Sequence, residues 1–203
     1  MFKLYNKYIL PRLLDRGMRP AEFNETRTEV VKQARGAVLE IGFGSGYNLP
    51  FYKDVSKLYA LDPSAELFAY AKDRISSVSF PVEYLQNSAE NIPLEDNSID
   101  AVVSTWSLCS IPDLSRALQE IKRVLKPDGK FYFIEHGQSP KRINSMVQKF
   151  FTQVSRHFTG NCHLDRKMDD FIADSGLIIE SIEMLPEEGR PLMFSYQGVA
   201  LKK

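Results

Sequence analysis

The sequence predicts an α/β fold in which a mostly parallel β-sheet carries helices on both faces. Three observations support this. The apolar run 37–41 has the composition of a strand buried on both sides, and a glycine-rich turn follows it directly. Further strand-like segments at 57–61, 82–86, 99–104 and 130–135 alternate with helical patterns. Two strand-like segments, 177–185 and 193–201, close the chain.

Composition narrows the function classes. The 203 residues suffice for one domain with a full core. Lys+Arg and Asp+Glu each number 26, and this zero net charge argues against a dedicated nucleic-acid binder. Cys109 and Cys162 are too few for a disulfide framework or a zinc site, so we expect reduced thiols, a cytoplasmic protein and no metal. No apolar run is long enough to span a membrane, and the start lacks the apolar segment of a signal peptide.

Residues 1–35 predict a helical arm that precedes a core domain at 36–203. The apolar residues of 1–20 fall near one helical face, and Pro11 interrupts or restarts that helix. A second helix is expected over 21–35, before Gly36. Three roles remain open for the first helix: covering a ligand, packing on the domain, or contacting an anionic membrane surface.

The glycine turn is the first candidate binding element. Gly42, Gly44 and Gly46 alternate along the turn, where missing Cβ atoms permit positive φ and let a ligand approach the backbone. A helix should begin near 48–50, where proline suits a first turn. The next strand ends at Asp62, at the spacing from which a carboxylate reaches a ribose. Alternatively, Asp62 caps a helix over 63–74.

The motif around this turn distinguishes among nucleotide types. A dinucleotide fingerprint needs glycine at position 47, which is Tyr47, and no Lys-Ser/Thr follows as in a phosphate-binding loop. The observed Glu40-x-Gly42-x-Gly44-x-Gly46 resembles motif I of the class I S-adenosylmethionine (SAM) methyltransferases. This resemblance implies a Rossmann-like seven-stranded sheet whose last strand is antiparallel. It also implies that the N-terminal arm lies over the cofactor.

Two further segments carry the same resemblance. Residues 87–94 resemble the loop after strand 3 in the ubiquinone and menaquinone methyltransferases, where an acid often contacts adenine; here that position is Ser88. Ser88 can still hydrogen-bond adenine or serve only as a turn residue, and the backbone of Ala89 is the preferred reader. Thr105 and Trp106 follow strand 99–104 and should border the methionine portion, unless Trp106 is simply core. The resemblance implies these cofactor-binding residues: Glu40, Gly42, Gly44, Gly46, Asp62, Ser88, Ala89 and Thr105.

The acceptor side is expected from the second half. After a helix over 113–125, strand 130–135 ends at His136, which either orients a substrate, takes a proton or is structural. The helical pattern 142–158 indicates a lid over the acceptor or a core helix. The polar turn 160–166, which contains His163, leads into a helix at 165–175 and is a candidate for acceptor specificity. His136 and His163 are the catalytic candidates.

Pieces along nearly the whole chain resemble small bacterial relatives of the mammalian alkyl-thiol methyltransferases, among them Leu108-Cys109-Ser110, 131–136 and Gly160-Asn161-Cys162. The implied reaction is SN2 transfer of a methyl group from SAM to a small-molecule or lipid-like acceptor, with S-adenosylhomocysteine as product. The acceptor is a thiol, a quinone precursor or a phospholipid headgroup, and the protein a monomer or homodimer. One alternative is a SAM-binding regulator without turnover. A nicotinamide oxidoreductase is disfavoured by Tyr47 and the terminal strand pair.

Overall fold

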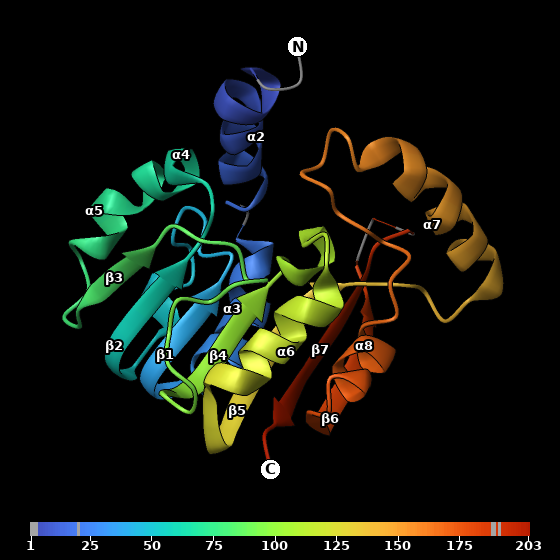
Figure 1. Cartoon of the computed structure of the whole chain (residues 1–203). Coiled ribbons are helices and arrows are strands. Elements are labelled where there is room, and N and C mark those ends of the chain that lie inside the picture. The colour runs from blue at the N-terminus through green and yellow to red at the C-terminus, as the bar shows by residue number, and fades with distance from the viewer. Residues whose placement is uncertain (1–3, 20, 188–189, 191) are drawn as a thin grey trace.

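The computed structural model describes residues 4–19, 21–187, 190 and 192–203, and it confirms the predicted α/β fold (Figure 1). Seven strands form one sheet in the order β3-β2-β1-β4-β5-β7-β6. The strands are β1 (Arg35–Ile41), β2 (Asp54–Leu61), β3 (Val82–Leu85), β4 (Ile99–Thr105), β5 (Leu125–His136), β6 (Ile178–Pro186) and β7 (Phe194–Leu201).

Strand β7 is antiparallel to both of its neighbours, β5 and β6, as the resemblance implied. The pairs β1–β2, β2–β3, β1–β4 and β4–β5 are parallel. Since β2 and β4 flank β1 on opposite sides, the chain reverses its direction of travel across the sheet at β1. Ligands of open α/β sheets bind at such a switch point, outside the carboxyl ends of the strands.

Helical segments cover both faces of the sheet and its carboxyl edge (Figure 1). They are the π-helical turn η1 (Tyr5–Ile9), α2 (Leu10–Gly17), α3 (Glu22–Val31), the short turn η2 (Leu49–Phe51), α4 (Ala65–Phe68), η3 (Ala69–Ala71), α5 (Lys72–Ile75), η4 (Leu108–Ser110), α6 (Leu114–Val124), α7 (Arg142–Ser155) and α8 (Met168–Asp174). Helices α6 and α8 pack on one face, and α3 packs on the other with η2 and η3.

The core has two layers, one on each side of the sheet. On one face Leu118 and Ile121 of α6 pack with Phe131 of β5, and all three are fully buried. On the other face Val31 of α3 packs with Leu58 of β2. This arrangement explains the continuous apolar composition of the central strands, which have no solvent-facing side.

Several expected boundaries were wrong, for local reasons. The helix expected from 48–50 is the single turn η2, because the chain is already extended at Tyr52 and β2 begins at Asp54. The helix expected over 63–74 is divided into α4, η3 and α5. Strand β5 begins at Leu125, five residues before the expected start at Lys130. The helix expected over 142–158 ends at Ser155.

Parts of two expected segments lie outside the described residues: 1–3 and 20 in the arm, and 188–189 and 191 in the connection between the last two strands. Within the described residues, none of the helices combines the length and apolar character that crossing a membrane requires.

Candidate active site

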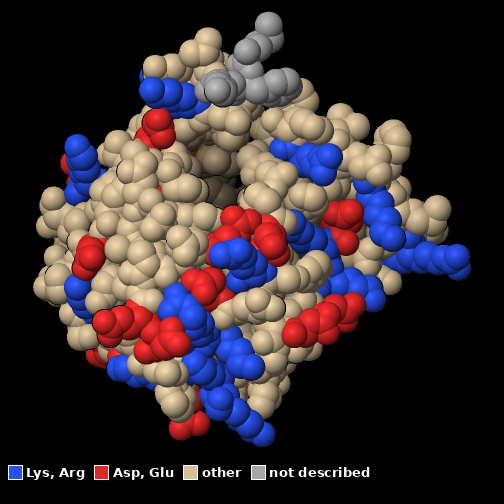
Figure 2. Space-filling view, viewed as in Figure 1, with Lys and Arg blue, Asp and Glu red and all other residues tan. Residues whose placement is uncertain are grey.

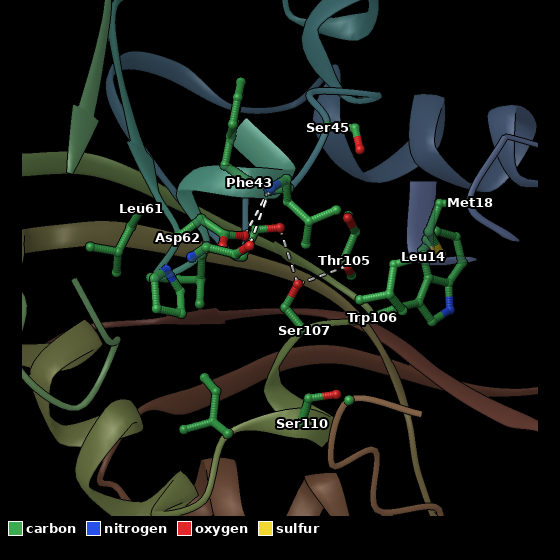
Figure 3. A pocket seen from close by; sticks show the side chains of 18 of the residues that line it. Leu14, Met18, Phe43, Ser45, Leu61, Asp62, Thr105, Trp106, Ser107 and Ser110 are labelled. Atoms are coloured by element: carbon green, nitrogen blue, oxygen red, sulfur yellow. Dashed lines mark hydrogen bonds between the residues drawn. The ribbon is translucent and has the colours of Figure 1, made fainter. Parts of the chain in front are cut away.

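A cavity of about 400 Å³ opens at the carboxyl ends of β1, β2 and β4, within the size range of small-molecule sites. Its walls are the glycine turn, the segments that follow β2, β3 and β4, and one side of α2. Figure 2 shows it as a hollow below the N-terminal helices. In Figure 3 Leu61 and Asp62 lie toward one end of it, and Leu14, Met18 and Trp106 toward the other.

The glycine turn needs glycine for two different reasons. Gly42, Gly44 and Gly46 have φ values of 66°, 54° and 75°, in the left-handed region that side chains disfavour. A Cβ on Gly42 would overlap the Ser107 side chain, whereas one on Gly44 would meet only a backbone oxygen at 3.8 Å. Space therefore restricts Gly42, and backbone conformation alone restricts Gly44.

Asp62 fastens the turn to the end of β2. Its Oδ2 accepts a hydrogen bond from the Gly44 N–H at 2.8 Å, and Oδ1 accepts one from the Ser64 N–H at 2.8 Å. Burial raises the pKa of this carboxyl above its usual range. Asp62 is not the helix cap, because the Ser64 hydroxyl accepts the N–H of Leu67 and caps α4. Each Asp62 oxygen keeps a lone pair that can accept a hydrogen bond from a hydroxyl group.

Glu40 is a buried acid at the end of β1. Its Oε1 accepts a hydrogen bond from Asn48 Nδ2 at 2.9 Å, and Oε2 accepts one from the Tyr52 hydroxyl at 2.7 Å. Burial raises the pKa of Glu40 to about 7, an effect that these two hydrogen bonds oppose. Glu40 therefore changes charge near neutral pH.

Two polar atoms beside Glu40 lack partners among the described residues, Nη1 of Arg27 and Oδ1 of Asn48, and both residues line the cavity. Arg27 is only 1% exposed, and its Nη2 donates to the Met18 carbonyl at 2.9 Å. Burial lowers its pKa to about 10. A buried donor and a buried acceptor left unpaired on one wall are costly unless a ligand pairs them. A zwitterionic amino acid, such as the methionine portion of SAM, fits both.

Aromatic rings surround the Arg27 guanidinium. The ring centroids of Phe23, Tyr47 and Trp106 lie 5.5, 5.5 and 5.3 Å from its Cζ. Trp106 is half-buried and has a φ of 52°, a conformation that costs about 1–2 kcal/mol in a residue with a Cβ. Such strain at a cavity wall is typical of a functional position, so core packing alone does not describe Trp106.

The remaining expected cofactor residues lie on the same cavity. Thr105 Oγ1 accepts a hydrogen bond from Asn48 Nδ2 at 3.0 Å. Ser88 donates its hydroxyl to Glu90 at 2.8 Å, and Ala89 is buried beside it. Every expected cofactor residue except Gly46 lines the cavity. Neither Arg27 nor Asn48 was expected to be a site residue, because the tertiary fold buries both of them and the local sequence does not indicate that burial.

The two expected catalytic histidines lie elsewhere. His136 is not among the cavity-lining residues; its ring centroid is 6.4 Å from that of Trp106. Burial lowers its pKa, but contacts with Cys109 and Glu187 outweigh burial and raise it to about 10. A base must be unprotonated at its working pH, so this environment favours a role for His136 in holding structure over one as proton acceptor. His163 lines a separate surface hollow with Gln138 and Lys149.

Helix α7 presents its apolar side outward. Ile143 is 77% exposed and Phe150 is 74% exposed, whereas the buried residues of α7 are Gln148 and Thr152. The Gln148 amide explains this orientation, because it accepts the Ser139 N–H at 2.7 Å and donates to the carbonyls of Gly137 and Leu192. The core-helix alternative for this segment was therefore wrong.

Known proteins are similar to this chain in sequence and in fold. Residues 39–133 match the methyltransferase domain family. The chain is 30% identical over 178 residues to the thiol S-methyltransferase TMT1B of Rattus norvegicus, a match that covers 81% of this chain and 72% of that protein. It is 28% identical over 170 residues to a phosphatidylethanolamine N-methyltransferase of Cereibacter sphaeroides, covering 82% and 83%.

Solved structures agree with the fold. The crystal structure of the YcgJ protein of Bacillus subtilis superposes with a TM-score of 0.72 at 17% identity, over 88% of this chain and 99% of that one. The similarity to the thiol S-methyltransferase establishes the family. The glycine turn, and Asp62 at the end of β2, agree with it. The chain belongs to the class I SAM-dependent methyltransferases, and SAM is its cofactor.

Proposed function

We propose that the protein methylates the sulfur of a small apolar thiol. The observation that carries the proposal is the absence of a free base: none of the described residues that line the cavity is His, Lys or Cys. The two carboxylates of the cavity, Glu40 and Asp62, are buried and engaged in hydrogen bonds. A cysteine-like thiol, with a pKa of about 8.5, is only a few per cent thiolate at about pH 7, but that thiolate is strongly nucleophilic. A thiol therefore depends less on an enzymic base than a phenol or a carbon acceptor does.

The cofactor supplies an electrophilic methyl group on a sulfonium with a neutral leaving group. We assign its carboxylate to Nη1 of Arg27 and its ammonium to Oδ1 of Asn48 with Glu40. The ribose hydroxyls are assigned to Asp62, and adenine to Ser88 and the backbone of Ala89. With the electrophile already activated, the protein contributes alignment and exclusion of water.

The acceptor end of the cavity is apolar. Leu10, Leu14 and Met18 of the N-terminal helical segment line the cavity, as do Ile111 and Pro112. This wall suits an alkyl or aryl substituent and offers no charged group for an ionic substrate. We propose that α2 lies over the bound cofactor and acceptor. Asp15 ties α2 to the glycine turn, because the Tyr47 hydroxyl donates to it at 3.1 Å.

A second proposal concerns where such acceptors are met. Exposed apolar side chains occur on the N-terminal helices, at Tyr8, Ile9 and Leu13, and along α7. Helices α2 and α7 both lie in the upper part of the molecule as drawn in Figure 1, and residues of α2 line the cavity. Apolar helices at one edge, accompanied by basic residues, suit peripheral contact with an anionic membrane. Flotation with vesicles of phosphatidylglycerol tests this: Phe150→Ser should reduce binding several-fold, and retention of full binding would refute it.

The activity is tested with purified protein, SAM and alkyl thiols of increasing chain length. Methyl thioether and S-adenosylhomocysteine should form in equal amounts, and alcohols of matched length should not react. Asp62→Ala should bind S-adenosylhomocysteine poorly and lose turnover while remaining folded. Methylation of phosphatidylethanolamine or of a demethylated quinol, without turnover of any thiol, would overturn the proposal. Cofactor binding without turnover on all three classes would favour the regulatory alternative.

A further inference from the structure

Three potential metal ligands converge behind the wall of the cavity. Cys109 belongs to η4, His136 ends β5, and Cys162 lies in the turn after α7. The two Sγ atoms are 3.4 Å apart. His136 Nδ1 is 3.7 Å from Cys109 Sγ and 3.6 Å from Cys162 Sγ. The expectation of no metal rested on the small number of cysteines, and the fold adds a histidine to the two that are present.

The sides of this triangle match one face of a zinc tetrahedron. With metal–sulfur bonds of about 2.3 Å and metal–nitrogen bonds of about 2.0 Å, tetrahedral angles place sulfur atoms about 3.8 Å apart and sulfur and nitrogen about 3.5 Å apart. The observed separations of 3.4, 3.6 and 3.7 Å are within a few tenths of an ångström of these values. A disulfide requires the sulfur atoms to approach to about 2.0 Å, a much larger change.

The outer nitrogen of His136 has the partner that a metal-bound histidine uses. Nε2 lies 3.2 Å from Oε1 of Glu187, and the Ser195 hydroxyl donates to the same oxygen at 2.9 Å. A carboxylate on Nε2 favours a proton on that nitrogen, so Nδ1 can offer its lone pair to a metal ion once any proton on it has been released. The carboxylate–histidine pair is thus an observation independent of the triangle.

The loops that carry the two cysteines are locked together. The His163 N–H donates to the Cys109 carbonyl at 2.9 Å, and Asn161 Nδ2 donates to the Ser110 carbonyl at 2.9 Å. Arg166 donates to the carbonyls of Leu108 and Ile111 at 3.0 and 2.7 Å. The ligand atoms are therefore held in place before any ion binds, which lowers the cost of ordering them.

We propose that Cys109, Cys162 and His136 bind one thiophilic divalent cation, zinc by preference, with Glu187 orienting the histidine. The thiols and Nδ1 give up any protons to solvent on binding, and the fourth coordination position is filled by water. The ion would join η4, the end of β5 and the turn 160–163 beside the acceptor end of the cavity. This site is independent of the proposed thiol methylation and does not require it.

Cobalt titration tests the site directly. The full-length protein is reduced, stripped with a chelator and titrated with Co²⁺ under anaerobic conditions, and sulfur-to-cobalt charge-transfer absorption is recorded. One equivalent should saturate the absorption, and Zn²⁺ should abolish it. Elemental analysis of the zinc-loaded protein should give one ion per chain. A reduced protein that shows no charge-transfer band would overturn the proposal, whether or not an unreduced sample contains a Cys109–Cys162 disulfide.

Variants distinguish this site from adventitious binding. Cys162→Ser changes a half-buried ligand and should weaken cobalt affinity at least 100-fold. Glu187→Gln keeps all three ligands and should weaken affinity about 10-fold. His163→Ala is the matched control, because it removes the histidine adjacent to Cys162 but outside the triangle, and its affinity should equal that of the wild type. Unchanged S-adenosylhomocysteine binding verifies folding, and stoichiometric binding retained in Cys162→Ser would refute the assignment.

Discussion

The environment of Glu40 predicts that cofactor affinity depends on pH near neutrality. The carboxyl is fully buried, and burial raises its pKa to about 7 in the free protein. Pairing with the ammonium group of the cofactor requires the ionised form. Below pH 7 binding must therefore first remove a proton from Glu40, and affinity falls with decreasing pH.

The magnitude follows from linkage. If Glu40 is ionised in the complex, the apparent affinity is reduced by the factor 1 + 10^(pKa − pH), where the pKa is that of Glu40 in the free protein. Between about pH 7.5 and about pH 5.5 this gives a roughly 25-fold loss, or about 2 kcal/mol. Glu40→Gln has no such proton to lose. It should bind about 10-fold or more weakly at pH 7.5 and show no pH dependence in this range.

Tryptophan fluorescence provides the assay, since Trp106 is the single tryptophan and lines the cavity. Titration with S-adenosylhomocysteine, which keeps the amino-acid portion but lacks the sulfonium charge, should give the same pH dependence as SAM. That result would assign the effect to the ammonium group. Wild-type affinity that is constant across the range, or a slope retained in Glu40→Gln, would refute the reasoning.

Three further predictions concern stability and the N-terminal arm. Because the native pKa of Glu40 lies above its usual value of 4.5, the folded state holds the proton more tightly than the unfolded chain. Between about pH 5 and about pH 7.5 the free energy of unfolding should therefore fall by about 2 kcal/mol relative to Glu40→Gln, and the same pH dependence in both proteins, measured by urea unfolding, would contradict this. Gly42→Ala should cost at least about 2 kcal/mol through its φ of 66° and overlap with Ser107, whereas Gly17→Ala, with no neighbouring atom within 4 Å, should change stability by less than about 1 kcal/mol. Tyr47→Phe removes the hydrogen bond to Asp15 and should speed S-adenosylhomocysteine dissociation several-fold in stopped-flow experiments; an unchanged rate would show that the arm does not retain the ligand.

The edge of the cavity formed by the glycine turn and Asp62 was predictable, because the positions of its residues depend on the spacing of the strands along the sequence. Glu40 and Asp62 end adjacent parallel strands, whose register pairs Ile41 with Leu61. That pairing alone places Asp62 beside the glycine turn, because Asp62 directly follows Leu61 and the turn directly follows Ile41. Local sequence is sufficient for a site built at the ends of neighbouring strands.

The burial of Arg27 and the orientation of α7 could not be predicted from the sequence. Arg27 lies in a helix with charged neighbours, and its guanidinium is surrounded by the rings of Phe23, Tyr47 and Trp106, which come from different parts of the chain. For α7 the apolar periodicity correctly predicted a helix, but the side of the helix that packs against the protein is the polar side and not the apolar one. The buried Gln148 side chain orients the helix, because it accepts one backbone hydrogen bond and donates another. A prediction that places the apolar face of a helix in the core does not take such hydrogen bonds into account.

The segment after β4 connects the two sites. Trp106, Ser107 and Ser110 line the cavity, while Cys109 between them points to His136 and Cys162. Glu135, buried at the end of β5, accepts the N–H groups of Ser107 and Cys109 at 3.0 and 3.2 Å and so fixes both halves of the segment on one carboxylate. An ion on Cys109 cannot move that residue without moving the cavity wall. Metal loading of the Cys109 site should therefore change the fluorescence of Trp106 even in the absence of cofactor, which makes the same tryptophan a reporter for both sites.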